Sequence, residues 1–417
     1  MSGSKSVGKE KSYIPTREEL VRTASNFVPI LRERAQATED LRNITEETIA
    51  DLKSAGLHKY FTPKRYGGFE MDWGTHMAVS RELGRGCGST SWISSVVFAN
   101  TWLLARFPEQ CQEEFWPSHP DAIVSSAYAG NGTMTETDGG YILDGEWKFS
   151  SGINHADCVC VAASISEFDP RSGEMPKFRL AMLLPDEFEV LDTWYSEGLK
   201  GSGSNNFRLK EQFVPAHRTI LTEEANGPNS PGARLHDSYI YKLDFTPHFF
   251  TLLAGPIVGT ALGALEQYCE ITKTRMGQMF KESVAEQVPV QVRVGESVAE
   301  IEAANLMVED LCQWLHQLGH DQMQLPGTGL LTIRRTLAYA SKLCLDATTR
   351  LSGMMGVSGQ TGRNPVQRHF RDARAISNHG GIQWDASMGP TGSVFLGVKT
   401  GDPSVDNKGT EHLVRAW

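Results

Sequence analysis

The sequence predicts an α+β fold built from three successive parts: a helical domain, a β-barrel or sandwich domain and a four-helix bundle. Helix-capping patterns occur in residues 16–118, and apolar side chains recur with a period near 3.6 in residues 226–390. Residues 119–225 instead alternate short apolar and polar runs between Gly-containing turns, which is typical of strands. Residues 1–15 are expected to form a mobile tail, and residues 391–417 an irregular one.

Composition excludes several classes of protein. The chain of 417 residues is 40% apolar and 22% charged, as in soluble globular proteins, and its net charge of −10 argues against a nucleic-acid partner. The longest apolar run, Leu252–Leu265, is too short and too rich in Gly to cross a bilayer, and the N-terminus lacks the apolar region of a secretory signal. We therefore expect a cytoplasmic protein with no membrane contact.

Capping signals define the helices of the first domain. Thr16 and Glu19 form a capping box, in which each side chain satisfies a backbone donor of the other residue. Thr45 opens another helix, which is expected to end at Gly56. The segment Pro63–Gly68 reads as a loop, and helices resume beyond it.

Two segments of the β domain have the length and composition of buried strands, namely Val159–Ala163 and Phe178–Leu184. Cys158 and Cys160 are two residues apart, so both should face the same side of a strand as small core residues. The seven cysteines form no C-x-x-C motif, and reduced thiols are expected.

The last domain carries two long apolar stripes at helical spacing, one from Val294 to Leu315 and one from Leu330 to Leu351. Gly255, Gly259 and Gly263 recur every four residues. This spacing predicts a helix face that another helix approaches closely.

Five segments resemble the acyl-CoA dehydrogenase fold, and their order and spacing extend the likeness from about residue 16 to residue 380. They are Leu52–Leu57 with Pro63–Gly68, Lys148–Asp157, Gly198–Asn205 with Val214–Pro215, Gly255–Gly259, and Phe370–Arg374. In the dehydrogenases a Glu that removes the α-proton of the substrate follows the last of these motifs, or lies on an early bundle helix. Here Asn378–Gly381 fills the first place, and no Glu occurs between Glu224 and Glu266. A dehydrogenase would therefore lack its base.

Within this fold the sequence is more similar to oxygenase components of two-component flavin-dependent monooxygenases, such as the hydroxylases of p-hydroxyphenylacetate and of steroid-derived phenols. The likeness rests on Asp121–Ser126, Ser150–Ala156, Trp194-Tyr195 with Gly201–Ser204, and His379. It implies reduced FMN or FAD from an NAD(P)H-dependent flavin reductase, a C4a-hydroperoxide formed with O2, a small phenol- or indole-type substrate, and a homotetramer. An amino-sugar N-oxygenase of the same fold and a non-catalytic flavin-binding protein are competing interpretations of the same motifs.

The resemblance also implies roles for three residues. Ser151 matches the position that meets flavin N5, although a Ser at a strand end can simply satisfy its own backbone. His379 matches a His near flavin C4a that holds or donates a proton, although Gly380 and Gly381 also fit a helix end. Ser126 matches a Ser that touches the substrate hydroxyl.

Asn100 departs from the resembling enzymes, which carry a His in this segment to bind and deprotonate a phenol. Asn can form hydrogen bonds but cannot accept a proton, so either the substrate needs no phenolate or another group forms it. Trp102 is a candidate wall of an aromatic pocket, together with Tyr128, Trp194 and Trp384.

The predicted flavin contacts are Ser150, Ser151, Gly152, Ser202, Ser204 and Arg275. The Gly- and Ser-rich segment Gly198–Asn205 can bind a phosphate through backbone donors. For Arg275, the resemblance implies a contact with the cofactor of a neighbouring subunit, although an ordinary surface Arg is the alternative. His316 and His320 have metal-ligand spacing on one helix, but they lie beside the apolar stripe, so we predict no metal site.

Overall fold

The N-terminal part of the chain is helical in the computed structural model, which describes residues 13–128, 132–165, 177–277, 281–323, 325, 328–401 and 406. Its helices are α1 (Arg17–Asn26), α2 (Val28–Leu41), α3 (Glu46–Ser54), α4 (Trp73–Gly86), α5 (Gly88–Leu104) and α6 (Glu109–Phe115). Both predicted caps are confirmed. Thr16 and Glu19 cap α1 reciprocally, and the Thr45 side chain accepts a hydrogen bond from the Thr48 backbone.

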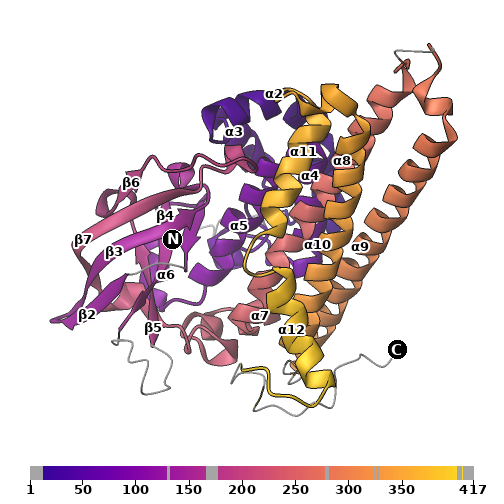
Figure 1. Cartoon of the computed structure of the whole chain (residues 1–417). Helices are drawn as coiled ribbons and strands as arrows, with labels where there is room; N and C mark the ends of the chain where they lie inside the picture. Colours follow the sequence, from indigo (N-terminus) through magenta and orange to yellow (C-terminus); the bar gives the residue numbers. More distant parts are fainter. Residues whose placement is uncertain are drawn as a thin grey trace, which may run out of the picture.

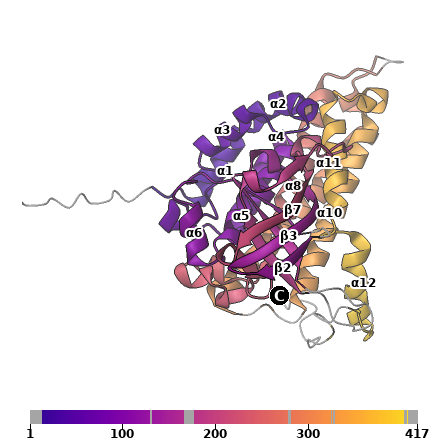
Figure 2. The same ribbon diagram turned by 90° about the vertical axis from the view of Figure 1, so that its left-hand side faces the viewer.

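The middle part is an eight-stranded sheet, seen face-on in Figure 2 with β2, β3 and β7 toward the viewer. The strands are β1 (Val124–Ala127), β2 (Thr133–Thr137), β3 (Gly140–Ser150), β4 (Cys158–Ser164), β5 (Phe178–Leu183), β6 (Glu189–Leu191), β7 (Asn205–Pro215) and β8 (Thr219–Leu221). Their order is β6-β7-β3-β2-β4-β5-β8, and β1 pairs parallel with β4. The two predicted strands are β4 and β5, and Cys158 and Cys160 are buried free thiols within one core.

The C-terminal part is the predicted bundle of α8 (Ala254–Lys273), α9 (Val288–His320), α10 (Gly329–Met354) and α11 (Pro365–Ser377), preceded by α7 (Phe245–Phe249) and followed by α12 (Trp384–Phe395). In Figure 1 the sheet lies on the left and the bundle on the right, with α5 between them. α12 extends the regular structure to Phe395, beyond the boundary expected at residue 390. The expected tail at residues 1–15 falls mostly outside the described residues.

The spaced glycines of α8 form the predicted close contact, and their partner is α4. A Cβ atom at Gly255 would lie 1.9 Å from Ser80 Oγ, and one at Gly259 would lie 2.2 Å from the Arg81 carbonyl oxygen. Real Cβ atoms never approach so closely, so only glycine permits this helix pair. The seam fixes the bundle against the N-terminal domain.

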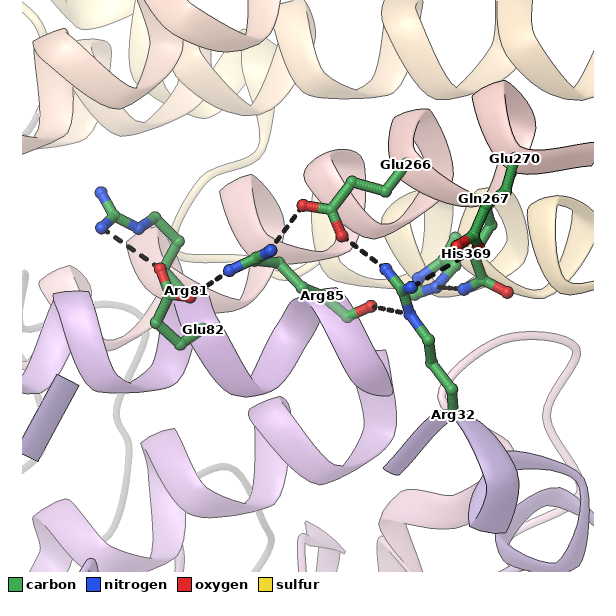
Figure 3. Close-up of polar contacts among 8 residues, drawn as sticks. All are labelled: Arg32, Arg81, Glu82, Arg85, Glu266, Gln267, Glu270 and His369. Carbon is green, nitrogen blue, oxygen red and sulfur yellow. Dashed lines mark hydrogen bonds and ion pairs between the residues drawn. The ribbon is translucent and has the colours of Figure 1, made fainter. Parts of the chain in front are cut away.

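A ladder of alternating charges runs alongside this seam (Figure 3). Glu266 on α8 accepts hydrogen bonds from Arg85 Nε at 2.7 Å and from Arg32 Nη2 at 2.5 Å. Arg85 also pairs with Glu82 on its own helix. Glu266 is the first Glu of the bundle in the sequence, and these contacts direct its carboxylate at α2 and α4.

One helix of the described residues, Phe245–Lys273, is long and apolar enough to cross a membrane. It is longer than the apolar run expected from the sequence because the short turns before α8 continue into it. However, 78% of its most apolar window is buried inside the fold. It is therefore a core helix that packs against its neighbours.

Candidate active site

A cavity of about 610 Å³ lies where the β domain meets α5 and the bundle. Its walls come from α5, β1, the end of β3, the turn before β7, the junction of α7 and α8, and the residues around the end of α11. The walls are largely aromatic and aliphatic, and the polar side chains among them are Ser126, Tyr128, Lys148, Ser151, Ser204, Asn378 and His379. This combination of apolar walls and a few polar groups is typical of sites for organic ligands.

Ser151 lies at the centre of a hydroxyl cluster on one wall. Its Oγ accepts a hydrogen bond of 3.0 Å from Trp92 Nε1 and lies 2.8 Å from Ser204 Oγ. Ser204 Oγ in turn lies 2.7 Å from Ser202 Oγ. The adjacent Ser150 is fully buried behind the wall, where its Oγ lies 2.7 Å from Ser125 Oγ. The cluster therefore joins three separate segments of the β domain to α5.

The turn that follows Ser151 brings these segments together. Gly152 has φ of +68°, and a Cβ there would lie 2.9 Å from Val97 on α5. Its backbone N–H donates a 3.0 Å hydrogen bond to the Ser202 carbonyl oxygen. Gly152 and Ser202 thus support the cavity wall from behind, whereas Ser151 and Ser204 face the cavity.

His379 belongs to the helical part of the cavity wall, just after the end of α11. Its Nδ1 accepts a 3.1 Å hydrogen bond from the Gly381 backbone N–H, and its ring meets the Trp92 ring edge-on at a centroid distance of 5.5 Å. Because Nδ1 is an acceptor, the proton of the neutral ring is on Nε2, which can donate to a molecule in the cavity. The surrounding protein desolvates the ring and lowers the pKa of His379, although its side chain is open to the cavity. The imidazole is therefore neutral at pH 7.

A second polar group is formed by Asn100, Ser126 and Tyr128. Asn100 is completely buried, and its Nδ2 donates to the Val124 carbonyl oxygen at 2.9 Å and to Ser126 Oγ at 3.0 Å. The Tyr128 hydroxyl donates to Asn100 Oδ1 at 3.4 Å. Ser126 accepts from Asn100, so it keeps its own proton and a second lone pair for a ligand. Asn100 thus acts on the cavity through Ser126.

Trp102 and Arg275, also predicted as site residues, lie elsewhere. Trp102 is buried in the core, where its Nε1 donates to the Ile240 carbonyl oxygen at 2.6 Å and its ring stacks on Phe245. Arg275 lies at the far end of α8 and donates to the Met354 and Met355 carbonyl oxygens at the end of α10. Neither residue lines the cavity.

Motif reasoning missed several wall residues: Trp92, Val96, Leu199, Phe249 and Phe250. Trp92 contacts both predicted catalytic residues of the cavity: its indole N–H donates a hydrogen bond to Ser151, and its ring contacts the His379 ring. α5 is buried around almost its whole circumference, so its apolar spacing does not reveal which side faces a ligand.

No Asp or Glu is among the described residues that line the cavity, and Glu266 is paired on another face of α8. A flavin ring system has apolar faces and a polar edge that carries nitrogen and oxygen. Aromatic and aliphatic walls with a hydroxyl cluster on one side fit such a group. The fold and this site together define a flavoprotein of the acyl-CoA dehydrogenase type without the dehydrogenase base.

Comparisons with known proteins agree with this class. Models of the acyl-CoA dehydrogenase N-terminal and C-terminal domains match residues 15–118 and 251–384. The oxygenase subunit HsaA of a flavin-dependent monooxygenase from Mycobacterium tuberculosis is 31% identical, over 91% of this chain and 96% of the relative. The oxygenase component of p-hydroxyphenylacetate 3-hydroxylase from Acinetobacter baumannii is 30% identical, over 91% and 89%.

Among solved structures, XiaF from Streptomyces sp. in complex with FADH2 and glycerol matches with a TM-score of 0.83 and 27% identity, over 93% of this chain and 97% of that one. The chain belongs to the family of oxygenase components of flavin-dependent monooxygenases. It is accordingly an enzyme, and the recognition made from its motifs is confirmed.

Proposed function

We propose that this enzyme uses reduced flavin and O2 to hydroxylate a small aromatic molecule of the phenol or indole type. The observation that carries the proposal is one cavity lined both by a hydroxyl cluster and by the His379 imidazole, with no carboxylate among the described lining residues. Bound reduced flavin supplies the electrons that activate oxygen for transfer to the ring.

Ser151 and Ser204 are the residues proposed to hold the polar edge of the flavin. Their hydroxyls face the cavity and are oriented by Trp92, Ser202 and one another. Ser150 and Gly152 would fix the backbone from which Ser151 projects. An ordered donor set of this kind needs no rearrangement when a ligand arrives.

His379 is the residue proposed to hold and donate a proton during the reaction. Its neutral ring carries a hydrogen on Nε2 and presents it to the cavity, while the Gly381 N–H fixes the ring through Nδ1. A donor in this place can stabilise negative charge on oxygen, and can return the proton when the charge disperses.

Ser126 is the proposed contact for the polar atom of the substrate. With one proton and one lone pair available, its hydroxyl can bind a phenol O–H or an indole N–H. Asn100 orients Ser126 but cannot remove a proton from a phenol. This difference favours substrates that are electron-rich without ionisation.

The names of the relatives support a two-component system in which a separate NAD(P)H-dependent reductase supplies the flavin. The structure with FADH2 and the FADH2-dependent resorcinol hydroxylase of Rhizobium sp. support FAD, and FMN remains the second candidate. A homotetramer, with Arg275 of each subunit near the cofactor of its neighbour, and a cytoplasmic location complete the proposal.

A product assay tests this function. Phenol and indole are each incubated in air with the protein, NADH, a generic flavin reductase and either FMN or FAD. Products one oxygen atom heavier than the substrate support the proposal. Oxidation of NADH in which all of the consumed O2 appears as hydrogen peroxide, with both flavins and both substrates, would overturn it.

A further inference from the structure

Three serine hydroxyls form a continuous row that begins at the active-site cavity and ends inside the protein. Ser151 Oγ lies 2.8 Å from Ser204 Oγ, which in turn lies 2.7 Å from Ser202 Oγ. Ser151 and Ser204 line the cavity, whereas Ser202 is fully buried. Among the residues that the structure describes, Ser204 is the only hydrogen-bond partner of the Ser202 hydroxyl. This serine row is therefore closed at its inner end and open at the cavity.

Trp92 limits how the serine row can be filled with hydrogen atoms. Its indole nitrogen is a donor only, and it occupies one lone pair of Ser151 Oγ at 3.0 Å. The three hydroxyls carry three hydrogens, and each of the two oxygen–oxygen contacts needs one of them. One hydrogen therefore remains for a ligand. When it lies at the cavity, either Ser151 or Ser204 donates it, and the other hydroxyl offers one free lone pair.

The two oxidation states of a flavin differ in what such a pair of hydroxyls can satisfy. In oxidised flavin, N5 and the neighbouring C4 carbonyl oxygen are both acceptors. Reduction by two electrons adds a hydrogen to N5, so this edge then has one donor beside one acceptor. One hydrogen and one lone pair satisfy both atoms of the reduced edge. The oxidised edge needs two hydrogens, so one of its acceptors would lose its hydration without gaining a donor.

We propose that Ser204, together with Ser151, makes the site selective for reduced over oxidised flavin, because the pair can offer only one hydrogen. The inference rests on the proposed function, in which these two hydroxyls hold the polar edge of the flavin. Trp92 supports the placement of N5 at this pair, since it contacts both Ser151 and the His379 ring. N5 adjoins the ring carbon at which reduced flavins react with O2, and that carbon should lie within reach of His379.

Three substitutions test this count of hydrogens. Ser204→Ala leaves the C4 carbonyl oxygen without a donor in both oxidation states, so the advantage of the reduced form should fall. Ser204→Thr keeps the hydroxyl and should keep the selectivity. Ser202→Ala is the matched control, because it makes the same replacement in the same row. One contact and two hydrogens remain in that variant, so one hydrogen is still left for the ligand.

Anaerobic titration measures the dissociation constants of reduced and oxidised flavin, with FMN and FAD in separate series. We expect the wild type to bind the reduced form at least about tenfold more tightly, which corresponds to about one hydrogen bond. A tenfold ratio raises the two-electron midpoint potential of the bound flavin by about 30 mV, which provides an independent measurement. Ser204→Ala should lower the ratio roughly tenfold, whereas Ser202→Ala and Ser204→Thr should change it less than about threefold.

Circular dichroism establishes that each variant is folded. If Ser204→Ala does not fold, Ser204→Cys takes its place, because a thiol is a weak donor of similar shape. Three outcomes would overturn the inference. They are a wild type that binds both oxidation states equally, a folded Ser204→Ala that keeps the ratio of the wild type, and a Ser202→Ala that lowers the ratio as much as Ser204→Ala does.

Failure of the proposed function is distinguishable from failure of this inference. A wild type that binds neither form of FMN or FAD ends the proposed function and the inference with it. Selective binding of reduced flavin without any hydroxylated product would contradict the proposed function alone. An unchanged ratio in Ser204→Ala, with hydroxylation intact, would indicate that the pair contacts a part of the flavin edge that reduction does not alter.

Discussion

Asp372 on α11 accepts a hydrogen bond of 2.6 Å from the backbone N–H of Leu199, in the turn before β7. Leu199 has φ of +52°, a left-handed conformation that non-glycine residues rarely adopt, and its side chain lines the active-site cavity. The carboxylate therefore holds a strained turn in place. It also joins the helix that leads to His379 to the segment that carries Ser202 and Ser204.

Replacement of Asp372 by Asn should change how stability depends on pH. Burial raises the pKa of Asp372 to about 7 from 3.8, so the folded state binds a proton that the unfolded chain has released. The wild type should therefore lose stability relative to Asp372→Asn as the pH rises from about 4 to about 7. The loss should reach at most about 4 kcal/mol, and the difference should be constant above that range.

Urea unfolding of both proteins between pH 4 and pH 8 measures this effect. Asp138→Asn, in an exposed turn, is the control and should follow the wild type. Parallel stability curves for the wild type and Asp372→Asn would show that Asp372 does not titrate in this range.

Loss of the Ser151 hydroxyl should uncouple oxygen consumption from hydroxylation. Ser151→Ala leaves the Trp92 Nε1–H buried without its acceptor, and it should cost about 1–3 kcal/mol of stability. The ratio of hydroxylated product to hydrogen peroxide should fall at least about tenfold, and Ser151→Thr should restore much of it. A double-mutant cycle with Trp92→Phe should show coupling between the two residues. Additive effects on the product ratio would contradict a shared role.

Replacement of His379 should change the acid side of the pH profile. The lowered pKa of His379 keeps the ring neutral at pH 7, so coupled hydroxylation should decrease as the pH falls through that pKa, below 6.5. His379→Asn should be less coupled at pH 7 and should lose this acidic limb. His320→Asn, at an exposed position on α9, should retain it. If the decrease of coupled hydroxylation at acidic pH persists in His379→Asn, then His379 is not the group that holds the proton.

A histidine at position 100 should favour phenols. Asn100→His places a titratable group behind Ser126, where it can accept the phenol proton, and kcat/KM for phenol should rise roughly tenfold or more. Indole is the matched control substrate and should gain nothing, because its oxygenation does not require an ionised hydroxyl. An equal change for both substrates would indicate a packing effect.

Much of the fold follows from local sequence signals. The caps at Thr16 and Thr45, the strands β4 and β5 and the glycine seam of α8 each depend on residues close together in the chain, and all are present in the structure. The end of the last helix was less predictable. α12 contains Pro390 and two glycines, which disfavour helix locally, yet it extends to Phe395.

Residues of the candidate site could be predicted where a short sequence motif contains them. They were harder to predict where only tertiary packing determines whether a side chain faces the cavity. Ser126, Ser151, Ser204 and His379 do line one cavity. The contact of Asp372 with Leu199 joins residues 173 positions apart, and no local pattern signals it. Trp102 illustrates the converse: on a helix buried on nearly every side, its aromatic character could not distinguish core from cavity.

Incubation under ¹⁸O₂ tests the central claim most directly. The wild type, with reduced flavin supplied by a reductase, is given phenol or indole in ordinary water, and the product is analysed by mass spectrometry. The account predicts a hydroxylated product that carries one ¹⁸O atom. A product whose new oxygen comes from water, or flavin reduction by an acyl-CoA in place of hydroxylation, would contradict it.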